Sequence, residues 1–308
     1  MCYKLPLPLL LMIASLLISC GSDDEPQPPA PKPEPEKPIV DARIPIRLSL
    51  NMGTRATDAS FETGDAVGLY VVNYNGATAG SLTLSGNHVN NMRFVFSTAW
   101  TPDQPIYWKD ETTHADFYVY YPYSAVTNIA AHPFAVQADQ STETGYKQSE
   151  FLWGKTANVA PTESTVGVTT RHLFSNAIVK LVAGDGFTQE QVDASGATVK
   201  LLNVVVQSQI NLATGIATVA GTASTIQMRD EGTRFRALVV PQSVASGTQL
   251  VQVTMEGQHY IMPLAADLTF VANKQHTLTV TVKKKASGID IGIDGWETDN
   301  IDYGGNAE

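Results

Sequence analysis

Cysteine is almost absent from this chain of 308 residues, which contains only two, Cys2 and Cys20. Both lie close to the N-terminus, so no disulfide can hold together the long remainder of the sequence. Hydrophobic residues make up 43% of the composition, which is enough to form a substantial core. Burial of apolar side chains, rather than cross-links, must therefore stabilise the fold.

Charged residues are also scarce, at 16%, and their balance is acidic, with a net charge of −10. A chain without a basic excess lacks the positive face that non-specific nucleic-acid binding requires. We therefore predict no nucleic-acid partner. The length is sufficient for one large domain or two ordinary ones.

The sequence contains none of the short motifs that mark common catalytic and cofactor sites. It has no Gly-x-Ser-x-Gly elbow, no phosphate-binding loop and no dinucleotide fingerprint. None of the six histidines has a partner at metal-ligand spacing, and no Asp-rich loop has calcium spacing. Since no nucleophile and base are placed together, we predict that the protein is not an enzyme and has no catalytic residues, cofactor or metal.

The N-terminus has the pattern of a targeting segment rather than of a membrane span. Lys4 precedes an apolar run from Leu5 to Leu17, which prolines interrupt and which is too short to cross a membrane. The run ends in Leu17-Ile18-Ser19-Cys20, which resembles the lipobox of bacterial lipoproteins. That resemblance implies that residues 1–19 are removed and that Cys20 carries a lipid, such as palmitate, in the outer membrane. The alternative is an ordinary secretory signal that happens to contain a cysteine.

Residues 20–40 have the composition of an extended tether. Asp23-Asp24-Glu25 follows the cysteine and resembles the surface-export signal of some outer-membrane lipoproteins, and a series of prolines mixed with Lys and Glu continues to Pro38. Such a segment forms semi-rigid polyproline II of about 3.1 Å per residue and buries no core. We expect the tether to hold the folded part several nanometres away from the lipid.

Most of the remaining sequence has the pattern of short β-strands. Val, Thr, Ile and Tyr recur in brief runs that Gly, Asn, Asp and Ser interrupt, and we expect strands at positions such as Asn91–Phe96, Ile106–Trp108 and Ala115–Tyr121. A short helix is expected only at Thr188–Asp193, with Thr188 as its N-cap, and the polar stretch Asp139–Glu150 is expected to be a long loop. The number of expected strands is larger than one small sandwich contains. We therefore predict two all-β sandwich domains, at 41–164 and 165–308.

The stretch from Ile44 to Met52 alternates strictly between apolar and other residues, which predicts a strand with one buried face. Its apolar side is expected to consist of Ile44, Ile46, Leu48, Leu50 and Met52. Near the C-terminus a second alternating segment repeats this aliphatic type and spacing with Ile289, Ile291 and Ile293. The second segment could fill the same pockets as the first, or it could simply be the last strand of its own sheet.

Several motifs, in order over nearly the whole chain, resemble the fimbrillin family, the Mfa-like subunits of type V fimbriae. No single motif is specific, but their succession is. They comprise the lipobox, Arg55-Ala56-Thr57, Phe61–Tyr70, Tyr107-Trp108-Lys109, Asp116–Pro122, Leu238–Gln242, Leu268-Thr269-Phe270, Ala272–His276 and Gly295-Trp296.

The resemblance implies two tandem transthyretin-like β-sandwich domains and a role in building a fimbria on the cell surface. A lipidated precursor is expected to reach the outer membrane, where an arginine-specific protease cuts behind the first strand. That strand then leaves, and a strand of another fimbrial subunit, of the same or a related kind, takes its place. Ile289, Ile291 and Ile293 are the candidate donor strand.

Three arginines are possible cleavage sites. Cutting at Arg43 would remove only the tether, whereas cutting at Arg47 would divide the alternating strand. Cutting at Arg55 would release the whole strand from a polar, Gly-containing stretch of the kind that proteases enter. We therefore favour Arg55, with Arg47 as the second choice.

A competing interpretation shares the lipobox, the tether and the β-sandwiches. In this interpretation the protein is a surface glycan-binding lipoprotein of a nutrient-uptake system. Such a function requires exposed aromatic rings on which sugars can stack. The candidates are Trp108, Tyr121, Tyr123 and Trp153.

Overall fold

A computed structural model of the protein describes residues 43–52, 60–285 and 288–293, with only the backbone described for 285 and 288–293. Within these residues the chain is built almost entirely of strands, so the all-β prediction is confirmed. Cys20 and Arg55 lie outside the described residues.

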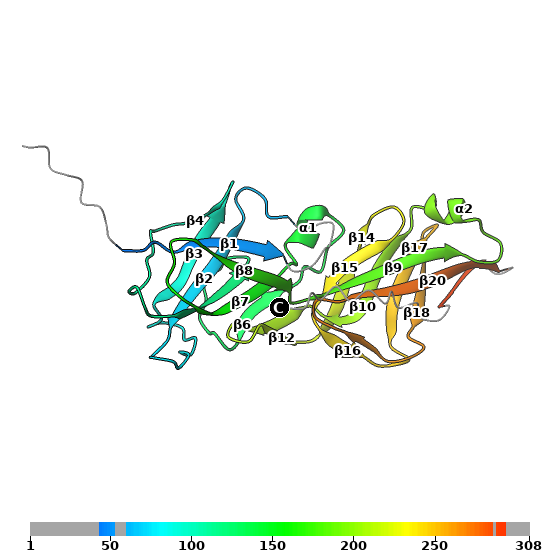
Figure 1. The fold of residues 1–308 in the computed structure, drawn as a ribbon. Coiled ribbons are helices and arrows are strands. Elements are labelled where there is room, and N and C mark those ends of the chain that lie inside the picture. Colours follow the sequence, from blue (N-terminus) through cyan, green and yellow to red (C-terminus); the bar gives the residue numbers. More distant parts are fainter. Residues whose placement is uncertain (1–42, 53–59, 286–287, 294–308) are drawn as a thin grey trace, which may run out of the picture. The chain divides into compact units, whose positions relative to one another are not determined.

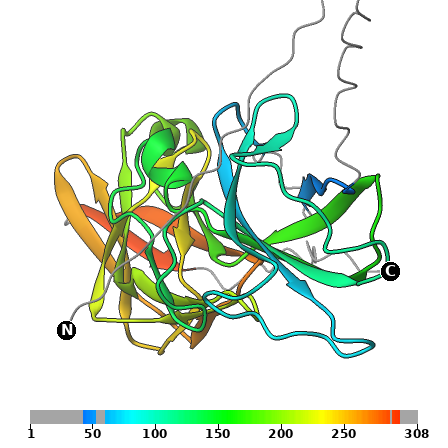
Figure 2. The same cartoon turned by 90° about the vertical axis from the view of Figure 1, so that its left-hand side faces the viewer.

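A seven-stranded sheet contains the first strands, in the order β1-β8-β7-β5-β2-β3-β4. Neighbouring strands within this sheet are antiparallel except for β1 and β8, which run parallel to each other. These two strands lie side by side in both views (Figures 1 and 2). The strands are β1 (Arg47–Met52), β2 (Ala66–Asn73), β3 (Val89–Phe96), β4 (Trp100–Pro102), β5 (Ala115–Tyr121), β7 (Leu152–Val159) and β8 (Thr165–His172).

Two further sheets and a strand pair come from the second half of the chain. A five-stranded sheet has the order β14-β15-β9-β20-β21, a four-stranded sheet has the order β13-β10-β17-β18, and β16 pairs with β19. Their bounds are β9 (Ser175–Ala183), β10 (Thr198–Val205), β13 (Ala223–Gln227), β14 (Arg229–Asp230), β15 (Phe235–Val239), β16 (Gln242–Val244), β17 (Gln249–Met255), β18 (Gln258–Pro263), β19 (Leu268–Phe270), β20 (Gln275–Lys285) and β21 (Gly288–Ile293).

One small sheet joins strands from both sides of residue 164. β6 (His132–Ala135) pairs with β11 (Gln207–Asn211), which pairs in turn with β12 (Ile216–Val219). The division into two domains near this residue stays a prediction. The pairing of β6 with β11 joins residues from both sides of that boundary by hydrogen bonds.

The described residues form two short helices. α2 (Gln189–Asp193) begins where the sequence predicted, and Thr188 and Gln191 form a capping box at its N-terminus. α1 (Glu143–Lys147), capped by Thr142, falls in a stretch predicted to be a loop, so the expectation of a single helix was wrong. Neither helix is long or apolar enough to span a membrane.

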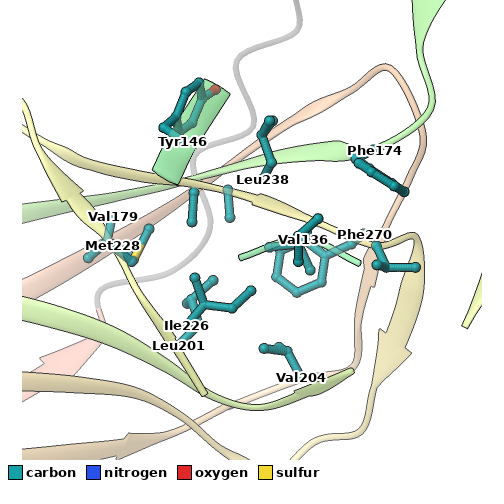
Figure 3. Packing of buried hydrophobic residues seen from close by; sticks show 14 of the residues in the cluster. Val136, Tyr146, Phe174, Val179, Leu201, Val204, Ile226, Met228, Leu238 and Phe270 are labelled. Atoms are coloured by element: carbon teal, nitrogen blue, oxygen red, sulfur yellow. The ribbon is translucent and has the colours of Figure 1, made fainter. Parts of the chain in front are cut away.

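The aromatic strand β5 is buried on both faces, which explains why its sequence is apolar at nearly every position. Phe117 and Val119 belong to one apolar cluster, whereas Tyr118 and Tyr120 belong to another. The first cluster lies under β1, and the second extends through the sheets of the second half. Figure 3 shows part of this second cluster, including Val136, Phe174, Leu201, Leu238 and Phe270.

Candidate functional site

The predicted first strand lies in a slot, with partners on both sides. The backbone of Arg47–Met52 pairs in parallel with residues 165–170 of β8. On the other side, the Ile46 N–H donates to the Ile106 carbonyl at 2.9 Å, and the Trp108 N–H donates to the Ile44 carbonyl at 2.9 Å. Ile106–Trp108 was predicted to be a strand, but it contributes only an isolated antiparallel bridge, between Tyr107 and Pro45.

The apolar side of this segment faces the core, as its alternation predicts. Ile46 is 3% exposed and Leu48 is 5% exposed, and both belong to the cluster that contains Phe117. Ile44 and Leu50 are partly buried and pack against the same cluster. Removing the segment would therefore expose an apolar groove and unpaired backbone groups on two sides.

Polar contacts fix the two ends of the strand. The Arg47 Nη1 donates to the Glu163 carbonyl at 2.6 Å, just before β8 begins. At the other end, the Thr170 hydroxyl donates to the Asn51 carbonyl at 3.3 Å. Upstream of the strand, the guanidinium of Arg43 lies 4.0 Å from the centre of the Tyr107 ring. The role of β8 was not predicted, because its parallel pairing links segments more than 100 residues apart.

A pocket of about 250 Å³ lies at the C-terminal end of β1, and Met52 forms part of its wall. Phe61, Tyr121, Tyr146 and Leu152 give the pocket an apolar and aromatic surface. The Tyr121 hydroxyl donates to Asp65 at 3.2 Å, and burial together with that carboxylate raises the pKa of Tyr121. Its hydroxyl therefore remains a hydrogen-bond donor at neutral pH.

Ion pairs surround this pocket. Lys147 pairs with Glu62 and lies 3.0 Å from Glu143, and these contacts raise the pKa of Lys147. Arg236 Nε lies 2.9 Å from Glu231. Both signs of charge thus meet at the rim, but acidic residues outnumber basic ones by five to three among the lining residues, so the pocket is acidic overall.

The four candidate aromatic residues do not form a shared exposed platform. Trp108 is 4% exposed and donates from Nε1 to the Thr162 carbonyl at 3.1 Å. Trp153 is partly buried and donates from Nε1 to the Leu212 carbonyl at 2.8 Å. Tyr121 packs against Phe61, and only Tyr123 reaches 36% exposure. This arrangement offers little support to glycan stacking.

The C-terminal segment with the three isoleucines is strand β21, at the edge of the five-stranded sheet. It pairs antiparallel with β20, with Ile289 opposite Lys284, Ile291 opposite Val282 and Ile293 opposite Val280. In this arrangement it is the last strand of its own sheet.

The sequence matches the fimbrillin-like family over residues 54–296, which is most of the chain. The chain belongs to the fimbrillin-like family. The prediction made from the succession of motifs is therefore confirmed. Among the residues that the structure describes, no group of His, Cys, Asp and Glu is arranged to hold a metal ion.

Named relatives agree with the family. The chain is 27% identical to "Putative fimbrium subunit Fim1C" of Bacteroides uniformis, over 84% of this chain and 87% of the relative. Two crystal structures, each described as a "putative cell adhesion protein", share the fold with TM-scores of 0.61. The one from Bacteroides uniformis is 23% identical and covers 82% of this chain and 97% of its own, and the one from Bacteroides ovatus is 16% identical and covers 84% and 99%.

Proposed function

We propose that this fimbrillin-like protein is a structural subunit of a cell-surface fimbria and that its subunits join by exchanging strands. The observation that carries the proposal is the slot of residues 44–52. β1 pairs with β8 along one edge, and the residues just before β1 hydrogen-bond on the other side to residues 106–108. Ile46 and Leu48 are its two buried aliphatic anchors. The match to the family begins at residue 54, immediately after β1, which agrees with a mature subunit that lacks this strand.

Loss of β1 would create a binding site of the strand-addition kind. Each restored backbone hydrogen bond contributes about 0.5–1.5 kcal/mol net, and each reburied aliphatic side chain adds about 1.5–3 kcal/mol. For a strand as long as β1 the gross gain is on the order of 10 kcal/mol, before the cost of ordering the incoming segment. Such a contact would be long-lived enough to hold a polymer together.

The slot sets the direction of the incoming strand. To form the same hydrogen bonds, the strand must run parallel to β8 and place branched or long aliphatic side chains at the positions of Ile46 and Leu48. The segment of β21 has this spacing. Because β21 hydrogen-bonds to β20 only along one edge, its departure breaks a single ladder. We propose that β21 of one subunit leaves its own sheet and enters the slot of the next.

Protease access favours a cut at Arg55 over one at Arg47. Arg47 lies within β1, where its backbone pairs with β8 and its side chain holds the Glu163 carbonyl. A protease must bind several residues in an extended form, so cleavage there requires β1 to leave first. A cut at Arg55 would leave β1 without a covalent link to the slot. Since this cut follows an arginine, the precursor requires an arginine-specific protease as a partner.

The N-terminal segment supplies the route to the surface in this proposal. A lipid on Cys20 would hold the precursor in the outer membrane until cleavage releases the subunit into the fimbrium. Replacement of Cys20 by Ser should abolish labelling by radioactive palmitate and release the full-length precursor from membranes. Retention of both label and membrane attachment in this variant would contradict lipidation at Cys20.

The test of the proposed function is limited cleavage of the purified precursor. Trypsin should yield a new N-terminus at Ala56, and the cleaved protein should form ladders that resist SDS, whereas the intact precursor stays monomeric. In Arg55→Ala both the new N-terminus and the ladders should be lost, and in Arg47→Ala both should persist. Ladders that form from Arg55→Ala would contradict the assigned site, and cleaved protein that remains monomeric would contradict strand exchange.

A further inference from the structure

The pocket at the end of β1 has no role in the steps described so far. It lies directly in line with the slot, because Met52 ends the strand and also forms part of the pocket wall. We propose that this pocket holds the side chain of Trp296 from a second copy of the chain, whose tail has replaced β1. The inference rests on the strand exchange proposed above and adds a specificity anchor to it.

The size of the pocket points to a side chain as its occupant. Sites for small organic ligands occupy roughly 300–1,000 Å³. At about 250 Å³ this pocket falls below that range and is suited to one large aromatic side chain. Because the slot leads into the pocket, such a side chain would arrive on the same segment that fills the slot.

The register of the tail brings Trp296 to the pocket. If Ile289 takes the place of Ile46, then Ile291 takes that of Leu48, Ile293 that of Leu50, and Gly295 that of Met52. The three aliphatic positions of the slot are then filled, no side chain stands where Met52 stood, and Trp296 is the next residue. A glycine can adopt either sign of φ without a Cβ penalty, so a chain with glycine at position 295 can turn the indole into the pocket.

The neighbouring register is disfavoured by charge. With Ile289 in the place of Ile44, Gly295 would leave the Leu50 position empty and Glu297 would take the Met52 position. The carboxylate of Glu297 would then meet a pocket lined by five acidic residues and three basic ones, Glu62, Asp65, Glu143, Glu150, Glu231, Lys147, Arg229 and Arg236. Like charges repel in such a partly buried place.

The lining suits an indole. Phe61, Tyr121 and Leu152 supply apolar contact, carboxylates at the rim can accept from the indole N–H, and Lys147 can lie over its face. Buried Trp residues that also satisfy their N–H are typical anchors of protein interfaces. Among the residues past Ile293, where the described chain ends, Trp296 is the first large apolar one.

The experiment measures how fast polymers dissociate. Full-length precursors of wild type, Trp296→Ala and Trp296→Phe are cleaved with trypsin, and the loss of SDS-resistant ladders is followed at a fixed temperature after dilution. We expect Trp296→Ala to dissociate at least tenfold faster than wild type, with Trp296→Phe in between. Equal rates for Trp296→Ala and wild type would overturn the inference.

A second variant blocks the pocket from the receiving side. Ser60 is exposed and lines the pocket, so Ser60→Trp should occupy it and accelerate dissociation to a similar extent even with a wild-type tail. Ser85→Trp, on an exposed loop, is the matched control and should dissociate as wild type does. If Trp296→Ala weakens the ladders but Ser60→Trp does not, the indole binds elsewhere and the assignment of this pocket is wrong.

Failure of the underlying exchange gives a different result. A chain that ends after Ser287 lacks the entire donor segment, so its failure to form ladders is required by the proposed function. If this shortened chain polymerises as wild type does, the tail is not the donor and both proposals fail. If it stays monomeric while Trp296→Ala matches wild type, strand exchange survives and only the role of Trp296 is rejected. Unfolding of each precursor by urea confirms that every variant is folded before cleavage.

Discussion

At the scale of single residues, Gly215 shows how a turn depends on a distant side chain. Its φ is +65°, in the left-handed region, and a Cβ there would lie 2.3 Å from the ring of Trp153. We expect Gly215→Ala to lower the free energy of unfolding by roughly 2–4 kcal/mol, from backbone strain and displacement of the indole. Urea denaturation measures the loss.

The matched control for this prediction is Gly196→Ala. Gly196 has φ of +63° but nothing within 4 Å of an added Cβ, so only the backbone cost of about 1 kcal/mol remains. The excess loss in Gly215→Ala therefore reports the contact with Trp153. Equal losses in the two variants would show that this contact is not close enough to matter.

His132 should make the protein sensitive to acid. It is 4% exposed, its Nε2 lies 3.1 Å from the Ser124 hydroxyl, and burial lowers its pKa. In the unfolded chain the imidazole takes up a proton near pH 6.5, whereas in the folded protein burial shifts this protonation to lower pH. Its contribution to stability is thus complete above pH 6.5 and is lost as the pH falls below that value, by up to about 1.4 kcal/mol per pH unit.

Comparison of His132→Phe with wild type between pH 7.5 and pH 5 isolates this effect, because the variant should have the flatter profile. His172 acts in the opposite direction. Burial disfavours its charged form, but Glu150 at 2.8 Å outweighs burial and raises its pKa, so its contribution is largest at low pH and is lost as the pH rises. His259→Gln, at an exposed position, is the control. Parallel profiles for wild type and His132→Phe would contradict the prediction.

At the scale of elements, the proposed assembly has different consequences for β1 and for its partner strand β8. In the proposed assembly β1 leaves with the removed segment, whereas β8 remains as a wall of the slot. Leu48→Ala, in a side chain that is 5% exposed, should destabilise the precursor by about 2–5 kcal/mol, yet the polymers formed after cleavage should be as stable as wild type. Thermal unfolding of precursors and dissociation of ladders measure the two quantities.

Val168→Ala on β8 is the companion variant. Val168 is fully buried in the same cluster and stays in the subunit, so its truncation should weaken both the precursor and the polymer. A Leu48→Ala polymer that dissociates faster than wild type would show that β1 is retained in the assembled form, which contradicts its removal.

Local pattern was sufficient to predict some elements and could not predict others. The alternation of Ile44–Met52 and the cap at Thr188 are properties of neighbouring residues, and both agree with the structure. α1 was missed because a five-residue helix has almost no periodicity, although Thr142 and Glu143 offered an N-terminal signal. What secures this helix is distant, since the Arg236 guanidinium lies 4.3 Å from the centre of the Tyr146 ring.

The neighbours of the slot were also beyond the reach of local pattern. Nothing in Thr165–His172 alone indicates that it pairs in parallel with residues near the N-terminus. The hydrogen bond from Arg47 to the carbonyl of Glu163 likewise depends on the folded arrangement. The sequence could therefore predict a strand with one buried face and, through resemblance, a family, whereas the slot and its pocket required the structure.

At the scale of the whole molecule, the proposed strand exchange would make each subunit both a donor and an acceptor, with the two roles on separate segments. A chain that ends after Ser287 should keep its slot but lose its donor strand. Once cleaved, it can receive a tail but cannot pass one on, so it should terminate any polymer that it joins. Added to cleaved wild type in equal amount, it should shorten the SDS-resistant ladders to about two or three subunits, by the statistics of random joining.

The matched control is Arg55→Ala in the full-length chain, which should retain β1 in its slot and still have a donor tail. This variant should join only at the opposite end of a polymer, because it can donate but cannot accept. A mixture of the shortened chain with Arg55→Ala, after cleavage, should therefore form dimers and nothing longer, whereas each alone should remain monomeric. Dimers in either single sample would show that the subunits make a contact other than the one between slot and tail. An absence of dimers in the mixture would show that the tail is not the donor strand.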